Sequence, residues 1–146
     1  MRKRTIAREC ALKVLYQAEI TRREIQVAAD NYWGEYETID QVVKEFSDRL
    51  TQGVMLYSKV IDEKISQYAT NWQLKRMAVI DRNILRIGTF ELLYTPDIPP
   101  KATINEAVEL AKKYGDIESS KFVNGILDKI HKTEVIPQNI KTIKSS

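Results

Sequence analysis

Apolar side chains recur every three or four residues along most of the chain, which is the spacing of one face of a helix. Five segments carry this pattern: residues 5–22, 40–68, 74–95, 103–114 and 118–132. Residues 24–38 mix aromatic and polar side chains, which predicts a short helix followed by a loop. No segment alternates apolar and polar positions for long enough to form a β-sheet. The sequence therefore predicts an all-α protein.

Two features predict where the longest helices begin and end. Asp40 is placed to cap the first turn of the helix over 40–68. The segment TPDIPP ends the helix over 74–95, because proline lacks a backbone N–H and clashes with a continuing turn. The periodic pattern fades near the C-terminus. We therefore expect residues 1–132 to form a single helical domain and residues 133–146 to form an irregular tail.

The last two helical segments contain a capping motif and two unusual glycines. Thr103 and Glu106 form a T-x-x-E capping box, in which each side chain bonds the other residue's backbone N–H. Gly115 suits the left-handed position that follows a helix end. Asn124-Gly125 is a turn-forming pair inside a helical pattern, where glycine costs about 1 kcal/mol relative to alanine. A close helix contact at Gly125 explains the pair, with the Asn124 side chain bonded to backbone, to a neighbour or to RNA.

Composition places the chain among ordinary soluble globular proteins. It has 146 residues, of which 43% are hydrophobic and 29% are charged. No apolar run approaches the roughly 20 residues that a membrane span needs, and no signal-peptide pattern follows the basic N-terminus. The single Cys10 rules out an internal disulfide and fits a reducing compartment. We therefore expect a cytoplasmic protein without a membrane segment.

The net charge of +3 is distributed unevenly along the chain. Residues 1–23 contain seven basic and two acidic side chains, whereas the remainder contains 16 basic and 18 acidic ones. A cluster of this kind favours a polyanionic partner more strongly than a diffuse basic surface does. A solvated and frayed terminus explains the same charges without any partner, so charge alone leaves both interpretations open.

Residues suited to catalysis or metal binding are scarce. The five glycines are scattered, so no phosphate-binding loop is present. Cys10 and His131 lie far apart in sequence and are too few for a typical zinc site. Acid pairs such as Glu106 and Glu109 are ordinary on helix surfaces. The sequence therefore predicts that the protein is not an enzyme and has neither a cofactor nor a metal site.

Basic and aromatic side chains occur together, which favours single-stranded nucleic acid. Cations neutralise phosphates, and aromatic rings stack on unpaired bases for about 1–3 kcal/mol each. Packing of the aromatic rings in the core is the alternative explanation. The candidates in the first helix are Arg2, Lys3, Arg4, Arg8 and Tyr16, and those near the C-terminus are Lys112, Lys113, Tyr114, Lys121 and Phe122.

Three segments resemble the NusB family of bacterial transcription antitermination factors. They are TIARECALKVLYQAE (5–19), DRNILRIGTFELLY (81–94) and INEAVELAKKYGDIESSKFVNGILDKI (104–130), and they occur in the family's order. The resemblance implies a fold of two small helical bundles without a catalytic site. It also implies three partners: boxA-type single-stranded RNA of ribosomal RNA leader transcripts, the small-subunit ribosomal protein that acts as NusE, and the RNA polymerase antitermination complex.

The resemblance also implies roles for individual residues. Tyr16 and Asp81 match positions at the interface with the ribosomal partner. This chain has only Arg2-Lys3-Arg4 where relatives can have a longer arginine run, which implies a lower intrinsic affinity for RNA. With Lys121 added for its charge beside the motif, the expected RNA-binding residues are Arg2, Lys3, Arg4, Arg8, Tyr16, Tyr114, Glu118, Lys121 and Phe122.

Two other classes of protein are alternatives. RNA cytosine methyltransferases can carry a NusB-like N-terminal domain, and a related RNA-binding module could act without a catalytic domain of its own. The chain ends at Ser146, which leaves no room for a cofactor-binding sheet, so we expect no binding of S-adenosylmethionine. A helical DNA-binding module would need a basic recognition helix. The helix over 119–131 has only Lys121, Lys129 and His131 as basic residues, and Asp128 opposes them.

Overall fold

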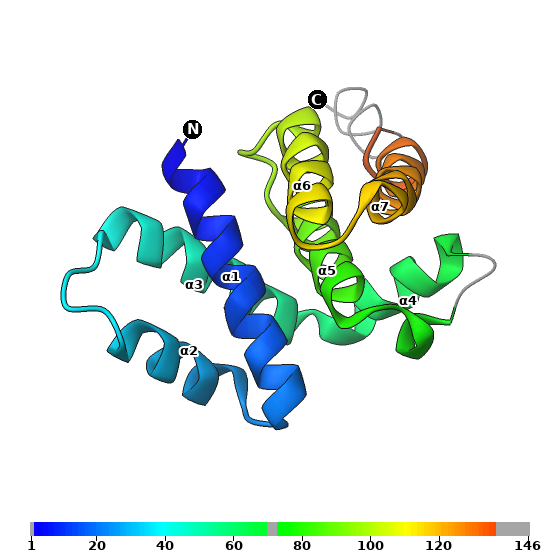
Figure 1. Cartoon of the computed structure of the whole chain (residues 1–146). Helices are drawn as coiled ribbons and strands as arrows, with labels where there is room; N and C mark the ends of the chain where they lie inside the picture. Colours follow the sequence, from blue (N-terminus) through cyan, green and yellow to red (C-terminus); the bar gives the residue numbers. More distant parts are fainter. Residues whose placement is uncertain (1, 70–72, 137–146) are drawn as a thin grey trace.

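The computed structural model describes residues 2–69 and 73–136, and its regular elements there are all helical (Figure 1). This confirms the predicted fold class. None of the described helices combines the length and the apolar character that a membrane span requires. The elements are α1 (Arg2–Thr21), α2 (Ile25–Gly34), α3 (Gln41–Leu56), α4 (Ser58–Tyr68), the 3-10 helix η1 (Leu74–Arg76), α5 (Val79–Tyr94), α6 (Pro100–Tyr114), α7 (Ile117–Ile130) and the π-helical turn η2 (His131–Val135).

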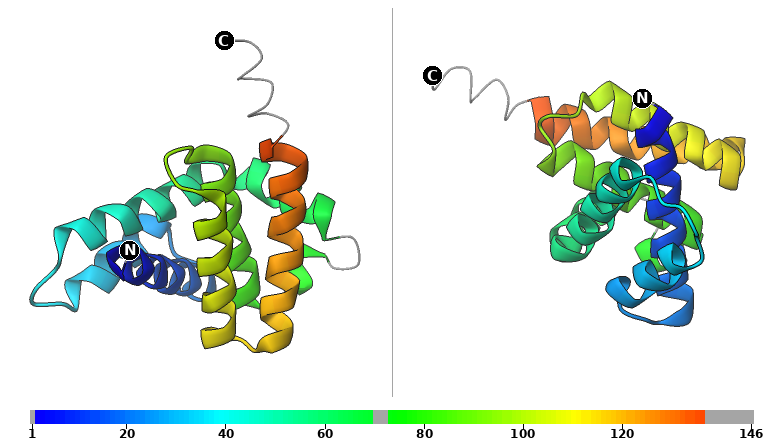
Figure 2. Two further views of the ribbon diagram at one scale, coloured as in Figure 1. Left: turned by 90° about the horizontal axis from the view of Figure 1, so that it is seen from above. Right: turned by 90° about the vertical axis from the view of Figure 1, so that its left-hand side faces the viewer.

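The helices form two bundles that share α1, as the resemblance implied. Helix α1 packs against α2 and α3 on one side and against α5 on the other, while α4 to α7 form the second bundle (Figures 1 and 2). Cys10 and Val14 of α1 belong to the smaller core with α2. Leu12 and Leu15 of the same helix belong to the larger core. Helix α1 is therefore apolar on two sides because it completes both cores.

The helix predicted over 40–68 begins as expected but is interrupted. The Asp40 carboxylate accepts hydrogen bonds from the N–H groups of Val42 and Val43, which confirms the cap. At Tyr57 the backbone leaves the helical region, so α3 and α4 are separate helices. The Tyr57 ring stacks on Tyr94 of α5, with ring centroids 3.9 Å apart. The prediction of one long helix was wrong because hydrophobic spacing does not reveal this tertiary contact.

The predicted capping box does not form. Helix α6 begins at Pro100, where the fixed φ and missing N–H of proline suit the first helical position. Thr103 therefore lies inside the helix, and its hydroxyl donates to Oε1 of Glu91 at 2.9 Å. Glu106 accepts a hydrogen bond from the Thr5 hydroxyl of α1 at 2.8 Å. Both side chains of the motif make tertiary contacts instead of capping their own helix.

The two unusual glycines have roles that differ from those predicted. Gly115 has φ −115°, which is not left-handed, and a Cβ there would lie 2.7 Å from Oγ of Ser119. Close approach at the turn therefore explains this glycine. The pair Asn124-Gly125 is exposed, and a Cβ at Gly125 would meet no described neighbour within 4 Å, so the expected helix contact is wrong. Gly88 has that role, because its Cβ would lie 2.7 Å from Leu127 of α7.

The chain remains helical beyond the predicted end of the domain. Val135 in η2 is buried in the larger core. Glu134 accepts a hydrogen bond from the Tyr68 hydroxyl at 3.0 Å and forms an ion pair with Lys64 at 2.5 Å. These contacts anchor the first residues of the segment that was predicted to be irregular. Residues 137–146 of that segment lie outside the described part of the chain.

Candidate functional site

Arg8 lies in a buried ion pair and not on the surface, where it was expected. Arg8 is only 3% exposed. The guanidinium donates from Nε to Oε2 of Glu91 at 2.9 Å and from Nη2 to Oε1 at 2.7 Å. The Thr103 hydroxyl donates to the same carboxylate, so the group joins α1, α5 and α6. The expected exposure of Arg8 was wrong, because its partner is 83 residues away in sequence.

The other three basic residues at the start of α1 are exposed. The Lys3 ammonium lies 3.1 Å from the Asp40 carboxylate. The Arg4 guanidinium lies 5.1 Å from the centroid of the Phe46 ring. The first turn of α1 contains no acidic residue. Cations at a helix N-terminus oppose the helix dipole, so Arg2, Lys3 and Arg4 add to a field that is already positive and attracts anions.

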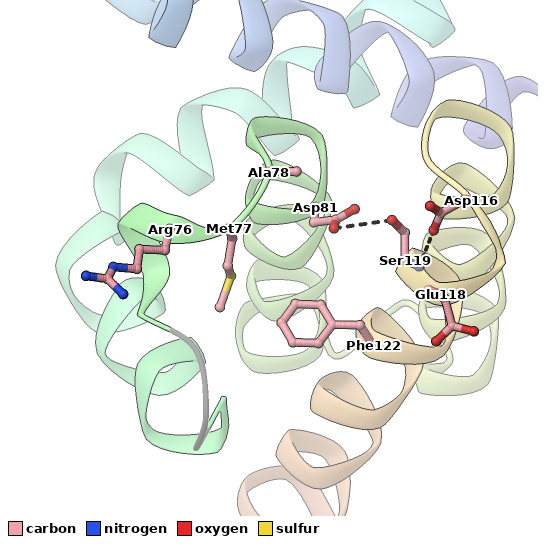
Figure 3. A pocket seen from close by; sticks show the side chains of 8 residues that line it. All are labelled: Arg76, Met77, Ala78, Asp81, Asp116, Glu118, Ser119 and Phe122. Atoms are coloured by element: carbon pink, nitrogen blue, oxygen red, sulfur yellow. Dashed lines mark hydrogen bonds between the residues drawn. The ribbon is translucent and has the colours of Figure 1, made fainter.

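A pocket of about 460 Å³ brings together three of the predicted site residues, Asp81 of α5 and Glu118 and Phe122 of α7 (Figure 3). We call it the Asp81 pocket. The remaining lining residues were not among the predicted site residues. Of these, Asp116 alone had a signal in the sequence, because an aspartate directly before a helical pattern is a common N-cap. The residues that were missed are Arg76, Met77, Ala78, Asp116 and Ser119.

Asp81 presents an unsatisfied acceptor within this pocket. Asp116 caps α7 by accepting the Ser119 N–H at 2.7 Å, and the Ser119 hydroxyl donates to Oδ2 of Asp81 at 3.3 Å (Figure 3). Oδ1 of Asp81 is buried without a hydrogen-bond partner among the described residues. Burial raises the pKa of Asp81, and the nearby Asp116 carboxylate adds to this, although the bond from Ser119 opposes it. Oδ1 therefore keeps an acceptor capacity that no described donor uses.

The charge of the Asp81 pocket determines which ligands it can hold. Three carboxylates line it, and Arg76 is its one basic lining residue among those that the structure describes. A phosphate group would be repelled, whereas a lysine or arginine side chain would be attracted, and N–H edges of bases could donate to the carboxylates. Phe122 is half-buried, packs against the larger core and points its ring toward Met77 (Figure 3). Its ring therefore packs against the core while remaining partly exposed.

The remaining predicted site residues lie outside this pocket. Tyr16 on α1 is 39% exposed. Tyr114 at the end of α6 is half-buried, and the Lys113 ammonium lies 5.5 Å from its ring centroid. Lys121 is exposed and lies 3.5 Å from the Glu118 carboxylate. Of the aromatic residues predicted to bind RNA, Phe122 lines the Asp81 pocket and Tyr16 and Tyr114 do not.

The described residues offer no group of three or more His, Cys, Asp or Glu side chains that could hold a metal ion. The site consists instead of an exposed basic helix end and a separate acidic and aromatic pocket. An all-helical fold that carries these two surfaces defines a class of binding proteins for charged macromolecules.

Comparison with known proteins identifies the family. A family model described as the NusB family matches residues 5–132, and the chain belongs to this family. A relative, the transcription antitermination protein NusB of Anaeromyxobacter dehalogenans (strain 2CP-1), is 46% identical over 128 residues, which cover 88% of this chain and 89% of the relative.

Two solved structures agree with this assignment. The structure of T. maritima NusB superposes with a TM-score of 0.85 at 40% identity, covering 94% of this chain and 96% of that one. A chain in the crystal structure of the antitermination factors NusB and NusE in complex with dsRNA superposes with a TM-score of 0.83 at 29% identity. That match covers 90% of this chain and 98% of the other. The likeness therefore extends over nearly the whole fold.

Proposed function

We propose that this chain is a non-enzymatic, RNA-binding transcription antitermination factor that acts in the cytoplasm with the ribosomal protein NusE. The proposal rests mainly on one structural match, which covers 90% of this chain. The matching chain comes from a structure of NusB and NusE in complex with dsRNA. The names of the curated relatives support the role in antitermination. The alternative, an RNA-binding module related to that of RNA cytosine methyltransferases, is not favoured, because the relatives are named as transcription antitermination proteins.

In this proposal the RNA is boxA-type, single-stranded RNA, and its backbone follows the basic start of α1. Arg2, Lys3 and Arg4 are exposed there and can neutralise phosphates. Bases that reach α7 meet Phe122 and Glu118, where a ring can stack and a carboxylate can accept from a base N–H. Arg8 acts indirectly, because its buried bond to Glu91 fixes α1 on the second bundle.

NusE is proposed to contact the surface formed by α1 and the beginning of α5. Tyr16 is exposed on α1, and Asp81 offers a buried carboxylate oxygen that lacks a donor. An arginine or lysine of NusE would satisfy that oxygen with a charge-assisted hydrogen bond. The contact would also neutralise a carboxylate that burial destabilises. The assembled pair of proteins would then join the RNA polymerase antitermination complex.

Titration of a labelled boxA-like RNA tests this function. The affinity should rise when NusE is present and fall with added salt. Arg4→Ala should reduce the slope of log affinity against log salt by about one for each phosphate that the protein no longer neutralises. Lys59→Ala is the matched control, because Lys59 is an exposed cation on α4, away from the basic end of α1. The absence of RNA binding at low salt, with or without NusE, would refute the proposal.

A further inference from the structure

A second pocket lies beside the basic end of α1, where α1 meets the end of α2 and the loop that leads to α3. Its volume is about 560 Å³, which is within the range of small-molecule sites and large enough for a nucleobase. We call it the Tyr36 pocket. Its walls combine cations with aromatic rings, and the residues that matter here are Arg2, Lys3, Lys13, Tyr32, Trp33 and Tyr36.

The charge of the Tyr36 pocket is positive once its ion pairs are considered. Two carboxylates line it, and each has a cationic partner. Glu9 lies 2.6 Å from the Lys113 ammonium of α6, and Asp40 lies 3.1 Å from that of Lys3. Arg2 and Lys13 are exposed and form no ion pair within the part of the chain that the structure describes. Two cations therefore remain available for a bound anion.

The aromatic wall is rigid and presents one accessible ring. Tyr36 is 48% exposed, whereas Tyr32 and Trp33 are 7% and 8% exposed. The Tyr36 ring centroid lies 5.4 Å from that of Tyr32 and 6.1 Å from that of Trp33. The Tyr36 hydroxyl also donates to the Tyr32 hydroxyl at 3.2 Å. Two buried rings thus hold a third ring at the surface, which lowers the entropy cost of stacking a ligand on it.

We propose that the Tyr36 pocket seats one unpaired nucleobase of the bound RNA, stacked on Tyr36, with the adjacent phosphates on Arg2 and Lys13. The proposal rests on the RNA-binding function proposed above and extends the path of the RNA from the start of α1 to the end of α2. A base and its phosphates need an aromatic face and cations at one place, and this pocket supplies both. Stacking makes little demand on base identity, so the seated nucleotide lies outside the specific element.

Extended RNA provides the test. The affinity of a boxA-like RNA is compared with that of the same RNA carrying four added uridines at each end. For the unaltered protein the added uridines should tighten binding about tenfold, which corresponds to stacking of one base. Tyr36→Ala should remove most of that gain, because stacking is lost while the cations Arg2 and Lys13 remain, whereas Tyr36→Trp should retain it. Val27→Ala is the control, since Val27 is an exposed apolar residue of α2 that does not line the pocket.

The outcomes separate this proposal from the proposed function. Tyr36→Ala should bind the shorter RNA as the unaltered protein does, and its thermal unfolding should confirm that it is folded. An equal gain from the added uridines in Tyr36→Ala, or no gain in the unaltered protein, would overturn the base seat while leaving RNA binding intact. Weaker binding of NusE by Tyr36→Ala, with RNA binding unchanged, would make the pocket a protein-docking site and would also overturn it. Failure of every RNA to bind would instead reject the function itself.

Discussion

Replacing Arg8 with alanine would remove the cation from a buried ion pair that joins the two bundles. Glu91 is 2% exposed, and Arg8 supplies two of the three hydrogen bonds that its carboxylate accepts within the described part of the chain. After the replacement the Thr103 hydroxyl is the one donor that remains to it among those residues. The carboxylate would be without its counter-ion and would not regain water. We therefore expect a large loss of stability from replacing a residue that the sequence predicted to bind RNA.

The expected loss is about 3–5 kcal/mol, which is the usual cost of removing one partner from a buried ion pair. The free energy of unfolding of such a domain is about 5–15 kcal/mol, so the loss is a large part of it. Replacing both partners should cost less than the sum of the two single changes, because no unpaired charge is left. The double variant Arg8→Met, Glu91→Leu keeps the volume of the site filled with apolar atoms.

Urea unfolding followed by circular dichroism measures these differences. Arg4→Ala is the matched control, since Arg4 is exposed and lies one turn earlier, over the same Phe46 ring as Arg8. It should change the free energy of unfolding by less than about 0.5 kcal/mol. A loss below about 1 kcal/mol for Arg8→Ala, or strict additivity in the double variant, would refute the assigned role of the pair.

Two further predictions concern the helix glycines and Asp81. Gly125→Ala should raise the free energy of unfolding by about 0.5–1 kcal/mol. Gly88→Ala should lower the free energy of unfolding by about 1–3 kcal/mol, because Leu127 leaves no room for a methyl group. Urea unfolding in which both variants changed stability in the same direction would contradict this. Asp81→Asn should weaken NusE binding in calorimetry but raise the melting temperature at neutral pH. Burial raises the pKa of Asp81, so its buried charge destabilises the fold above that raised pKa. This destabilisation disappears as pH falls through the raised pKa toward the ordinary pKa of aspartate. If Asp81→Asn raised the melting temperature as much at about pH 3 as at neutral pH, the assignment would be contradicted.

Most of the helices were predictable because their apolar spacing reflects local geometry. Several of the errors share one cause, which is a partner distant in sequence. Tyr57 interrupts a helix in order to stack on Tyr94. The Thr103 hydroxyl does not cap its own helix and instead donates a hydrogen bond to Glu91, which is also paired with Arg8. Local patterns assign each of these residues a role near its own position, and only the packed fold shows which distant contact is stronger.

The candidate site was predictable in part and by two routes. The basic start of α1 was selected by its charge, and Phe122 by the occurrence of aromatic and basic side chains together. Asp81 and Glu118 came from resemblance to the family. Their meeting in one pocket depends on how η1, α5 and α7 come together, which hydrophobic spacing does not specify. A direct signal for the Tyr36 pocket was present in the sequence and was missed. Tyr32, Trp33 and Tyr36 lie close together in sequence where the predicted short helix gives way to a loop, and their rings pack against one another there.

The position of α1 between two cores has a consequence for how the molecule loses its structure. Ala7, Cys10 and Val14 face one core, and Leu12 and Leu15 face the other. Melting of either bundle would strip one side of this helix and expose apolar area that the other bundle cannot cover. The two bundles should therefore unfold in a single cooperative transition, with the amides of α1 among the slowest to exchange. Any ligand that binds only the folded first turn of α1 would then protect both bundles by mass action, including helices it never touches.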